Sequence, residues 1–184
     1  MTETLRCKQI KPVFSPEKIA VRVRELAEEI DALYGDEPLV AVCVLKGGFI
    51  FCSDLVRFLH NKNLEVDFVR LSSYGRGCRS SGKIVFSKDA ETDLCDKHVL
   101  MVEDVVDSGR SMRFLLDVFA ARRVRSLRLA ALVDKQERRE VEVHVDFAAF
   151  QLNSGFIVGY GLDYAEHWRA LPGVCEIIVE QPEK

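Results

Sequence analysis

Three carboxylates and two hydroxyls occur within nine consecutive positions of this sequence. The surrounding residues 99–112 read VLMVEDVVDSGRSM. An apolar run leads into Glu103 and Asp104, two valines follow, and Asp107 then begins an Asp-Ser-Gly-Arg-Ser segment. Because carboxylates avoid a low dielectric unless they are paired, we expect them at the end of a buried strand, where they face a ligand.

The segment at residues 107–111 has the features of a phosphate site. Backbone N–H groups at a helix N-terminus, together with the hydroxyls of Ser108 and Ser111, suit a phosphate dianion. The nearby carboxylates would repel a bare phosphate, but they can accept hydrogen bonds from sugar hydroxyls and can attract Mg²⁺ that other phosphates bring. A sugar with a terminal phosphate and a metal-bound diphosphate satisfies both requirements.

On these residues the stretch resembles the motif with which type I phosphoribosyltransferases bind 5-phosphoribosyl 1-pyrophosphate (PRPP). That motif is an apolar run, an acidic pair, two apolar residues, and then Asp, Ser or Thr, Gly, a variable residue, and Ser or Thr. The resemblance implies that Glu103 and Asp104 hold the ribose hydroxyls near Mg²⁺, and that Asp107 accepts the proton at purine N7 as general base. The residues that it implies for the 5′-phosphate are Asp107, Ser108, Gly109, Arg110 (in the variable position) and Ser111.

Three further segments resemble the purine branch of this family, close to the bacterial hypoxanthine (hypoxanthine-guanine) phosphoribosyltransferases. The first is Leu45-Lys46-Gly47-Gly48, a turn that in the family binds pyrophosphate through backbone N–H groups and often has a cis peptide bond before the lysine. The second is Leu71-Ser72-Ser73-Tyr74-Gly75. The third combines 132–135, 156–164 and Arg169 and is specific to enzymes of 6-oxopurines.

Around the transferred group, the resemblance implies two kinds of contact. Lys46, Gly47 and Arg169 would bind pyrophosphate. Ser73 and Tyr74 would belong to a mobile loop, at about residues 72–84, that closes over the reacting centre and excludes water.

Around the base, the resemblance makes Lys135 the residue that contacts purine O6, and the chemistry of lysine agrees. An ammonium group only donates hydrogen bonds, so it suits a 6-oxo group and has nothing to accept from the 6-amino group of adenine. Phe156 would stack on the base, and Ile157 would recognise the base edge through its backbone. Asp163 would hold a second Mg²⁺, besides the ion near Glu103 and Asp104.

The activity implied by the resemblance is purine salvage. The enzyme would transfer the phosphoribosyl group from PRPP to N9 of hypoxanthine, and of guanine, to give IMP or GMP and pyrophosphate, with Mg²⁺ as cofactor. Relatives are dimers or tetramers, so a homo-oligomer is expected, but the sequence decides neither its size nor the ranking of hypoxanthine, guanine and xanthine.

Two rival interpretations remain open at this point. The first is a phosphoribosyltransferase for adenine, which Lys135 argues against, or for a pyrimidine, which has no counterpart to the N7 that Asp107 would serve. The second is a regulator that keeps the PRPP-binding fold and binds RNA or DNA through the basic cluster ARRVRSLR at 121–128. The cations of this cluster also suit a solvated helix end.

The elements that must position these residues alternate between strand and helix. Continuous apolar runs at 39–45, 98–105 and 127–135 are typical of parallel strands that are covered on both faces. Helices are expected from Pro16 to Gly35 and at about 49–61 and 111–122, and further strands at 64–74, 84–88, 143–150, 154–161 and 174–180. Ile19, Val23, Leu26, Ile30 and Leu33 should form the buried face of the first helix.

This pattern predicts an α/β fold of the type I phosphoribosyltransferase kind, with a mostly parallel central sheet flanked by helices. We expect a single domain over 1–184, with a small hood formed by about 1–14 and 150–184.

The composition favours a protein of the cytoplasm that binds neither membranes nor nucleic acid. The 184 residues carry a net charge of −3, and no apolar run approaches the ~20 residues of a membrane span. The six cysteines contain no C-x-x-C pair, so reduced thiols are expected rather than a zinc site or a disulfide framework.

Overall fold

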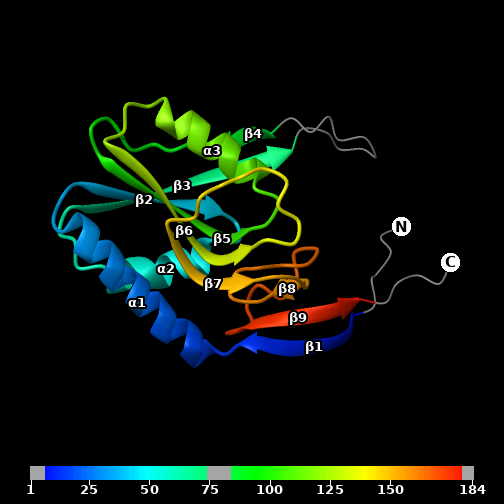
Figure 1. Ribbon diagram of the computed structural model, residues 1–184. Coiled ribbons are helices and arrows are strands. Elements are labelled where there is room, and N and C mark those ends of the chain that lie inside the picture. The colour runs from blue at the N-terminus through cyan, green and yellow to red at the C-terminus, as the bar shows by residue number, and fades with distance from the viewer. Residues whose placement is uncertain (1–6, 74–83, 180–184) are drawn as a thin grey trace.

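The computed structural model describes residues 7–73 and 84–179, which form two sheets and three helices (Figure 1). The elements are β1 (Cys7–Phe14), α1 (Pro16–Tyr34), β2 (Leu39–Leu45), α2 (Phe49–Phe58), β3 (Leu64–Ser73), β4 (Ile84–Lys88), β5 (His98–Val106), α3 (Arg110–Ala120), β6 (Ser126–Lys135), β7 (Phe147–Leu152), β8 (Ile157–Val158) and β9 (Val174–Val179).

The larger sheet has the strand order β4-β3-β2-β5-β6-β7. All of its neighbouring strands are parallel except β4, which pairs with β3 in the antiparallel direction at one edge. This arrangement confirms the predicted mostly parallel sheet. Because β5 lies between β2 and β6, the segment with the carboxylates ends at the centre of the sheet.

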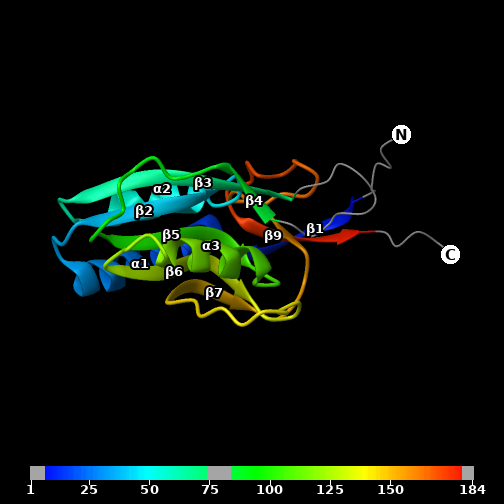
Figure 2. The same ribbon diagram turned by 90° about the horizontal axis from the view of Figure 1, so that it is seen from above.

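Helices cover both faces of this sheet, as Figures 1 and 2 show: α1 and α2 lie on one face and α3 on the other. Side chains of β2 alternate between the two cores. Ala41 and Cys43 join the core with α1 and α2, whereas Val40 and Val42 join the core with α3. Burial on both faces explains why β2 is apolar at every position.

Helix α1 begins and ends where the sequence predicts. The Ser15 hydroxyl accepts a hydrogen bond from the Lys18 N–H at 3.3 Å, and Gly35 ends the helix with a φ of 53°. The predicted burial of Leu33 was wrong, because this side chain is 49% exposed and Tyr34 is buried instead. Tyr34 follows Ile30 by four residues and therefore continues the buried stripe that Leu33 leaves.

The ends of the described chain pair with each other in a second sheet of order β1-β9-β8. Both of its pairings are antiparallel, and β1 and β9 lie side by side at one end of the molecule (Figures 1 and 2). This small sheet is the hood that was predicted from the terminal segments. The stacked rings of Phe14 and Phe150, with centroids 4.0 Å apart, connect it to the main core.

Three predicted boundaries were wrong. Helix α2 ends at Phe58 because Asn61 forms a turn, in which it donates to the Glu37 carbonyl and accepts from the Asn63 N–H. Strand β7 begins at Phe147 rather than at residue 143, and β8 is limited to two residues. Six of the residues from 159 to 168 have left-handed backbone conformations, with a positive φ, which a strand does not accommodate. None of the helices in 7–73 and 84–179 is long and apolar enough to cross a membrane.

Candidate active site

The carboxyl ends of the parallel strands form the rim of two adjoining pockets. The first has a volume of about 170 Å³ and is lined by the end of β5 and the turn into α3, from Glu103 to Met112. Ligands of open α/β sheets bind at this edge. The motif at 103–111 therefore lies along a single pocket, as its spacing predicts.

Glu103 and Asp104 are neighbours whose negative charges repel each other. Burial, and then the charge of Asp104, raise the pKa of Glu103 well above its ordinary value. Glu103 Oε1 accepts the Asp104 N–H at 3.0 Å, and Asp104 Oδ1 accepts the Val105 N–H at 2.8 Å. A cation or a hydroxyl donor beside this pair would relieve the repulsion, so the pair suits a sugar with a metal ion nearby.

The turn that precedes α3 requires a glycine. Gly109 has a φ of 83°, and a Cβ there would overlap the carbonyl oxygen of Val141. The Ser108 carbonyl accepts hydrogen bonds from Glu140 and Val141 at 3.0 and 3.1 Å, and Arg110 forms an ion pair with Glu140. The segment after β6 thus packs against this turn and holds it in place, while the N-terminus of α3 lies at the pocket.

A second turn approaches Asp104 from β2. The peptide bond between Leu45 and Lys46 is cis, as the family resemblance leads one to expect. A Cβ on Gly47 would overlap the Asp104 carboxylate, and a Cβ on Gly48 would lie 2.9 Å from the Val44 carbonyl oxygen. Only glycine lets the backbone of this turn pass so close to the carboxylates of β5.

The second pocket, of about 180 Å³, brings together residues that are distant in the sequence. It is lined by Asp104, Val105, Asp107, Lys135, Arg138, Gly155, Phe156, Ile157, Leu162 and Asp163. Asp107 is among them, as are the four residues that the resemblance places around the base, Lys135, Phe156, Ile157 and Asp163. The exposed ring of Phe156 is supported edge-on by Tyr164, at 5.0 Å between centroids, and provides an apolar wall.

Asp107 and Lys135 face each other across this pocket. Lys135 is 6% exposed, and its Nζ lies 3.8 Å from Asp107 Oδ1 and 3.5 Å from Glu137. Asp107 Oδ1 is buried and accepts no hydrogen bond from the described residues. A buried acceptor without a donor is unfavourable, so a ligand that supplies an N–H at this place would satisfy it.

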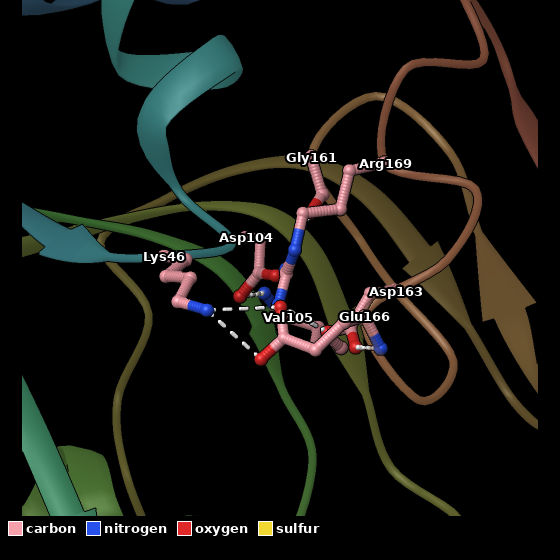
Figure 3. Close-up of polar contacts among 7 residues, drawn as sticks. All are labelled: Lys46, Asp104, Val105, Gly161, Asp163, Glu166 and Arg169. Carbon is pink, nitrogen blue, oxygen red and sulfur yellow. Dashed lines mark hydrogen bonds and ion pairs between the residues drawn. The ribbon is translucent and has the colours of Figure 1, made fainter.

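The side chains of Arg169 and Lys46 point toward each other from different parts of the chain (Figure 3). The Arg169 guanidinium donates to the Gly161 carbonyl at 2.8 Å and pairs with Asp163 at 2.8 Å. Its Nε is buried without a hydrogen-bond partner among the described residues. Both cations contact Glu166, which the sequence analysis did not single out.

Sequence reasoning also missed Arg139, which connects the ends of β5 and β6. It donates to the carbonyl oxygens of Val106, Asp107 and Lys135 at 2.9, 2.9 and 3.1 Å and pairs with Asp134 at 2.5 Å. Backbone carbonyls carry no side-chain signal, so this role is invisible in the sequence. The available signal was the arginine pair at 138–139, which begins three residues after the end of the resembling segment at 132–135.

We expect Arg139→Ala to lower the free energy of unfolding by about 3 kcal/mol, because it leaves a buried Asp134 unpaired and several carbonyls without donors. Urea unfolding followed by circular dichroism measures this loss. The matched control is Arg138→Ala, since that side chain is 67% exposed and should change stability little. Equal losses in the two variants would contradict the structural role of Arg139.

The carboxylates of the two pockets fit a metal ion that keeps other ligands. The described residues contain no cluster of three or more side chains able to hold a metal ion. Asp104 and Asp163 nevertheless line the same pocket. Mg²⁺ typically takes one or two protein carboxylates and completes its shell with water and substrate phosphates, so this donor set suits Mg²⁺ better than a tight structural metal.

Two predictions fall partly or wholly outside the described residues. Tyr74 and most of the expected mobile loop lie outside them, and only the backbone of Ser73 is described, at the end of β3. Among the side chains that are described, Cys43, Cys52, Cys95 and Cys175 are free thiols.

Three arginines of the basic cluster at 121–128 form ion pairs with carboxylates. Arg122 pairs with Asp89 at 2.7 Å, Arg125 with Glu37 at 2.5 Å and Arg128 with Asp146 at 2.8 Å. Arginines neutralised in this way attract phosphates weakly. The geometry therefore gives no support to a nucleic-acid surface at this cluster.

Comparison with known proteins agrees with the resemblance. Residues 11–165 match the family described as the phosphoribosyl transferase domain. The hypoxanthine-guanine phosphoribosyltransferase of Aquifex aeolicus is 42% identical over 171 residues, which cover 92% of this chain and 96% of that protein. The enzyme of the same name from Bacillus subtilis is 38% identical, over 88% of this chain and 89% of its own. The crystal structure of a hypoxanthine-guanine phosphoribosyltransferase from Bacillus anthracis superimposes with a TM-score of 0.86 at 35% identity, covering 95% of this chain and 100% of that one.

Proposed function

The chain belongs to the phosphoribosyltransferase family, and we propose that it is a purine-salvage enzyme acting on hypoxanthine and guanine. It transfers the phosphoribosyl group from PRPP to N9 of the base and releases pyrophosphate, giving IMP or GMP. The observation that carries the choice of base is the pocket in which Asp107, Lys135 and Phe156 meet beside the PRPP-binding motif.

In the proposed complex, the sugar phosphate lies along the end of β5. The turn at 107–111 and the N-terminus of α3 bind the 5′-phosphate with their N–H groups and hydroxyls. Glu103 and Asp104 accept hydrogen bonds from the ribose hydroxyls, and their negative charge stabilises the cationic character of the anomeric carbon in the transition state. Lys46, the backbone of Gly47 and Arg169 bind the leaving diphosphate.

The base lies in the second pocket, between β5 and the segment that contains Phe156. Lys135 donates to O6, and Asp107 accepts the proton from N7, which makes N9 more nucleophilic. Phe156 stacks on the ring, and the backbone of Ile157 contacts its edge. Ser73 and Tyr74 are proposed to close over the reacting centre, as the family resemblance implies.

We propose that the reaction depends on Mg²⁺, which supplies charge neutralisation on the diphosphate. Glu103, Asp104 and Asp163 are the residues that would hold it. We expect EDTA to remove most of the turnover and added Mg²⁺ to restore it, since the protein carboxylates alone form a weak site. Full activity in the presence of EDTA would contradict this assignment.

We further propose a homo-oligomer, a dimer or tetramer, that works in the cytoplasm. Val66 and Phe68 support an interface, because both are exposed apolar residues. They pair in register with Ala41 and Cys43 and therefore point to the face that carries α2. Light scattering coupled to size-exclusion chromatography tests this proposal, and a monomer at micromolar concentration would contradict it.

Parallel assays with hypoxanthine, guanine, xanthine and adenine, each with PRPP and Mg²⁺, test the proposed activity. Turnover of hypoxanthine or guanine with adenine inactive is the expected result, and it also ranks the 6-oxopurines. Turnover of adenine instead would contradict the role of Lys135. If folded protein turned over no purine, the proposed activity would be wrong.

A further inference from the structure

Glu166 lies between the two cations that the proposed function assigns to pyrophosphate. Lys46 Nζ is 2.9 Å from both carboxylate oxygens of Glu166, and the Arg169 guanidinium is 3.1 Å from one of them. Figure 3 shows the Glu166 side chain bridging Lys46 from the turn after β2 and Arg169 from the hood segment. Lys46 and then Arg169 hold the pKa of Glu166 below its ordinary value, so it is an anion at neutral pH.

An unusual backbone conformation holds the Glu166 carboxylate in this place. Ala165 and Glu166 both have left-handed conformations, with φ of 50° and 67°, which are unfavourable for residues with a Cβ. The Asp163 carboxylate accepts the Glu166 N–H at 2.7 Å, and Tyr164 and His167 bond to each other on either side of the turn. Such a conformation persists only where the surrounding structure enforces it.

We propose that Glu166 is a resident anion of the pyrophosphate site, which occupies Lys46 and Arg169 in the free enzyme and competes with diphosphate for them. This inference rests on the proposed function of the site. A diphosphate that contacts both cations has to displace the Glu166 carboxylate. Glu166 therefore weakens the binding of PRPP and of the product pyrophosphate, and it favours release of the product.

The geometry allows this displacement without rebuilding the site. The side chains of Lys46 and Glu166 are 44% and 63% exposed, so their ion pair is well hydrated and weak. Arg169 remains anchored by the Gly161 carbonyl and by Asp163 when Glu166 moves away. The competing carboxylate thus moderates diphosphate binding and does not block it.

The test compares wild-type protein with Glu166→Gln by calorimetry, with pyrophosphate as titrant in the presence of Mg²⁺. Gln keeps the shape of the side chain and removes its charge. We expect pyrophosphate to bind about fivefold more tightly, as for the loss of a competing exposed ion pair, and KM for PRPP to fall by a similar factor. KM for hypoxanthine should not change, since Glu166 does not line the base pocket.

Two further variants separate competition from a structural effect. Glu28→Gln removes the same charge at an exposed position of α1 and should leave pyrophosphate binding unchanged. Lys46→Met should weaken pyrophosphate binding more in the Glu166→Gln background than in the wild type, because Lys46 is then free of its internal partner. The fluorescence of Trp168, the single tryptophan, reports whether the loop remains folded.

Unchanged or weaker pyrophosphate binding by folded Glu166→Gln would overturn the inference, as would equal losses from Lys46→Met in both backgrounds. The calorimetric measurement requires no turnover, so it is independent of the purine assay. Protein that binds pyrophosphate but turns over no purine would contradict the proposed function alone. Wild-type protein that binds no pyrophosphate would overturn the inference.

Discussion

Replacing Asp107 by Asn is expected to lower kcat by about 10³-fold, because the loss of a general base typically slows a reaction by about this factor. The amide cannot take the proton from purine N7, although it has almost the same shape as the carboxylate. The buried Oδ1 of Asp107 has no hydrogen-bond donor among the described residues, so little internal structure depends on its charge. KM for PRPP should therefore change much less than kcat.

Steady-state kinetics with hypoxanthine and PRPP measure both parameters for Asp107→Asn. Asp117→Asn is the matched control, because this exposed carboxylate of α3 pairs only with Arg113 among the ion pairs of the described residues. If kcat and PRPP affinity fell by equal factors, Asp107 would act in sugar-phosphate binding and not as the base.

Lys135→Ala is expected to reduce the preference for hypoxanthine over adenine by about 100-fold in kcat/KM, because a site built to donate to one group rejects analogues that cannot accept. The ammonium group of Lys135 is nearly buried, 3.8 Å from Asp107, and only donates. Adenine presents a second donor there and leaves the lysine without an acceptor. Alanine removes this mismatch.

The measurement is the ratio of kcat/KM for hypoxanthine and adenine, each with saturating PRPP. Arg138→Ala is the control, since Arg138 lines the same pocket and also contacts Asp107 but is largely exposed. Arg138→Ala should change kcat/KM for each base more than it changes the ratio of the two values. An unchanged ratio in Lys135→Ala would show that another group reads the 6-position.

The local features of the site could be predicted from the sequence because they depend on neighbours along the chain. The acidic pair, Asp107 and Gly109 occupy fixed places at the end of one strand and in the turn that follows it. Gly109 requires a positive φ, which Gly adopts without steric cost. The cap at Ser15 and the stop at Gly35 are equally local, so α1 was predicted at both ends.

The meeting of Asp107 and Lys135 depends on the register of the sheet. Val106 pairs with Asp134 in the parallel ladder of β5 and β6, so the residues that follow them emerge side by side. The family resemblance identified Lys135, but the periodicity of the sequence alone does not determine the register between β5 and β6. A shift of one residue would turn this lysine to the other face.

The partners of Arg139 and Glu166 were decided by the tertiary structure alone. Most acceptors of Arg139 are backbone carbonyls, which every residue has. Glu166 meets Lys46 across 120 positions of sequence, through a left-handed turn whose residues are not glycine. The sequence by itself determined most of the strands and the place of the turn at 107–111 after β5, because these follow from short-range spacing. Only the folded chain decided which charges oppose each other across the site, because that depends on how the hood segment packs against the turn after β2.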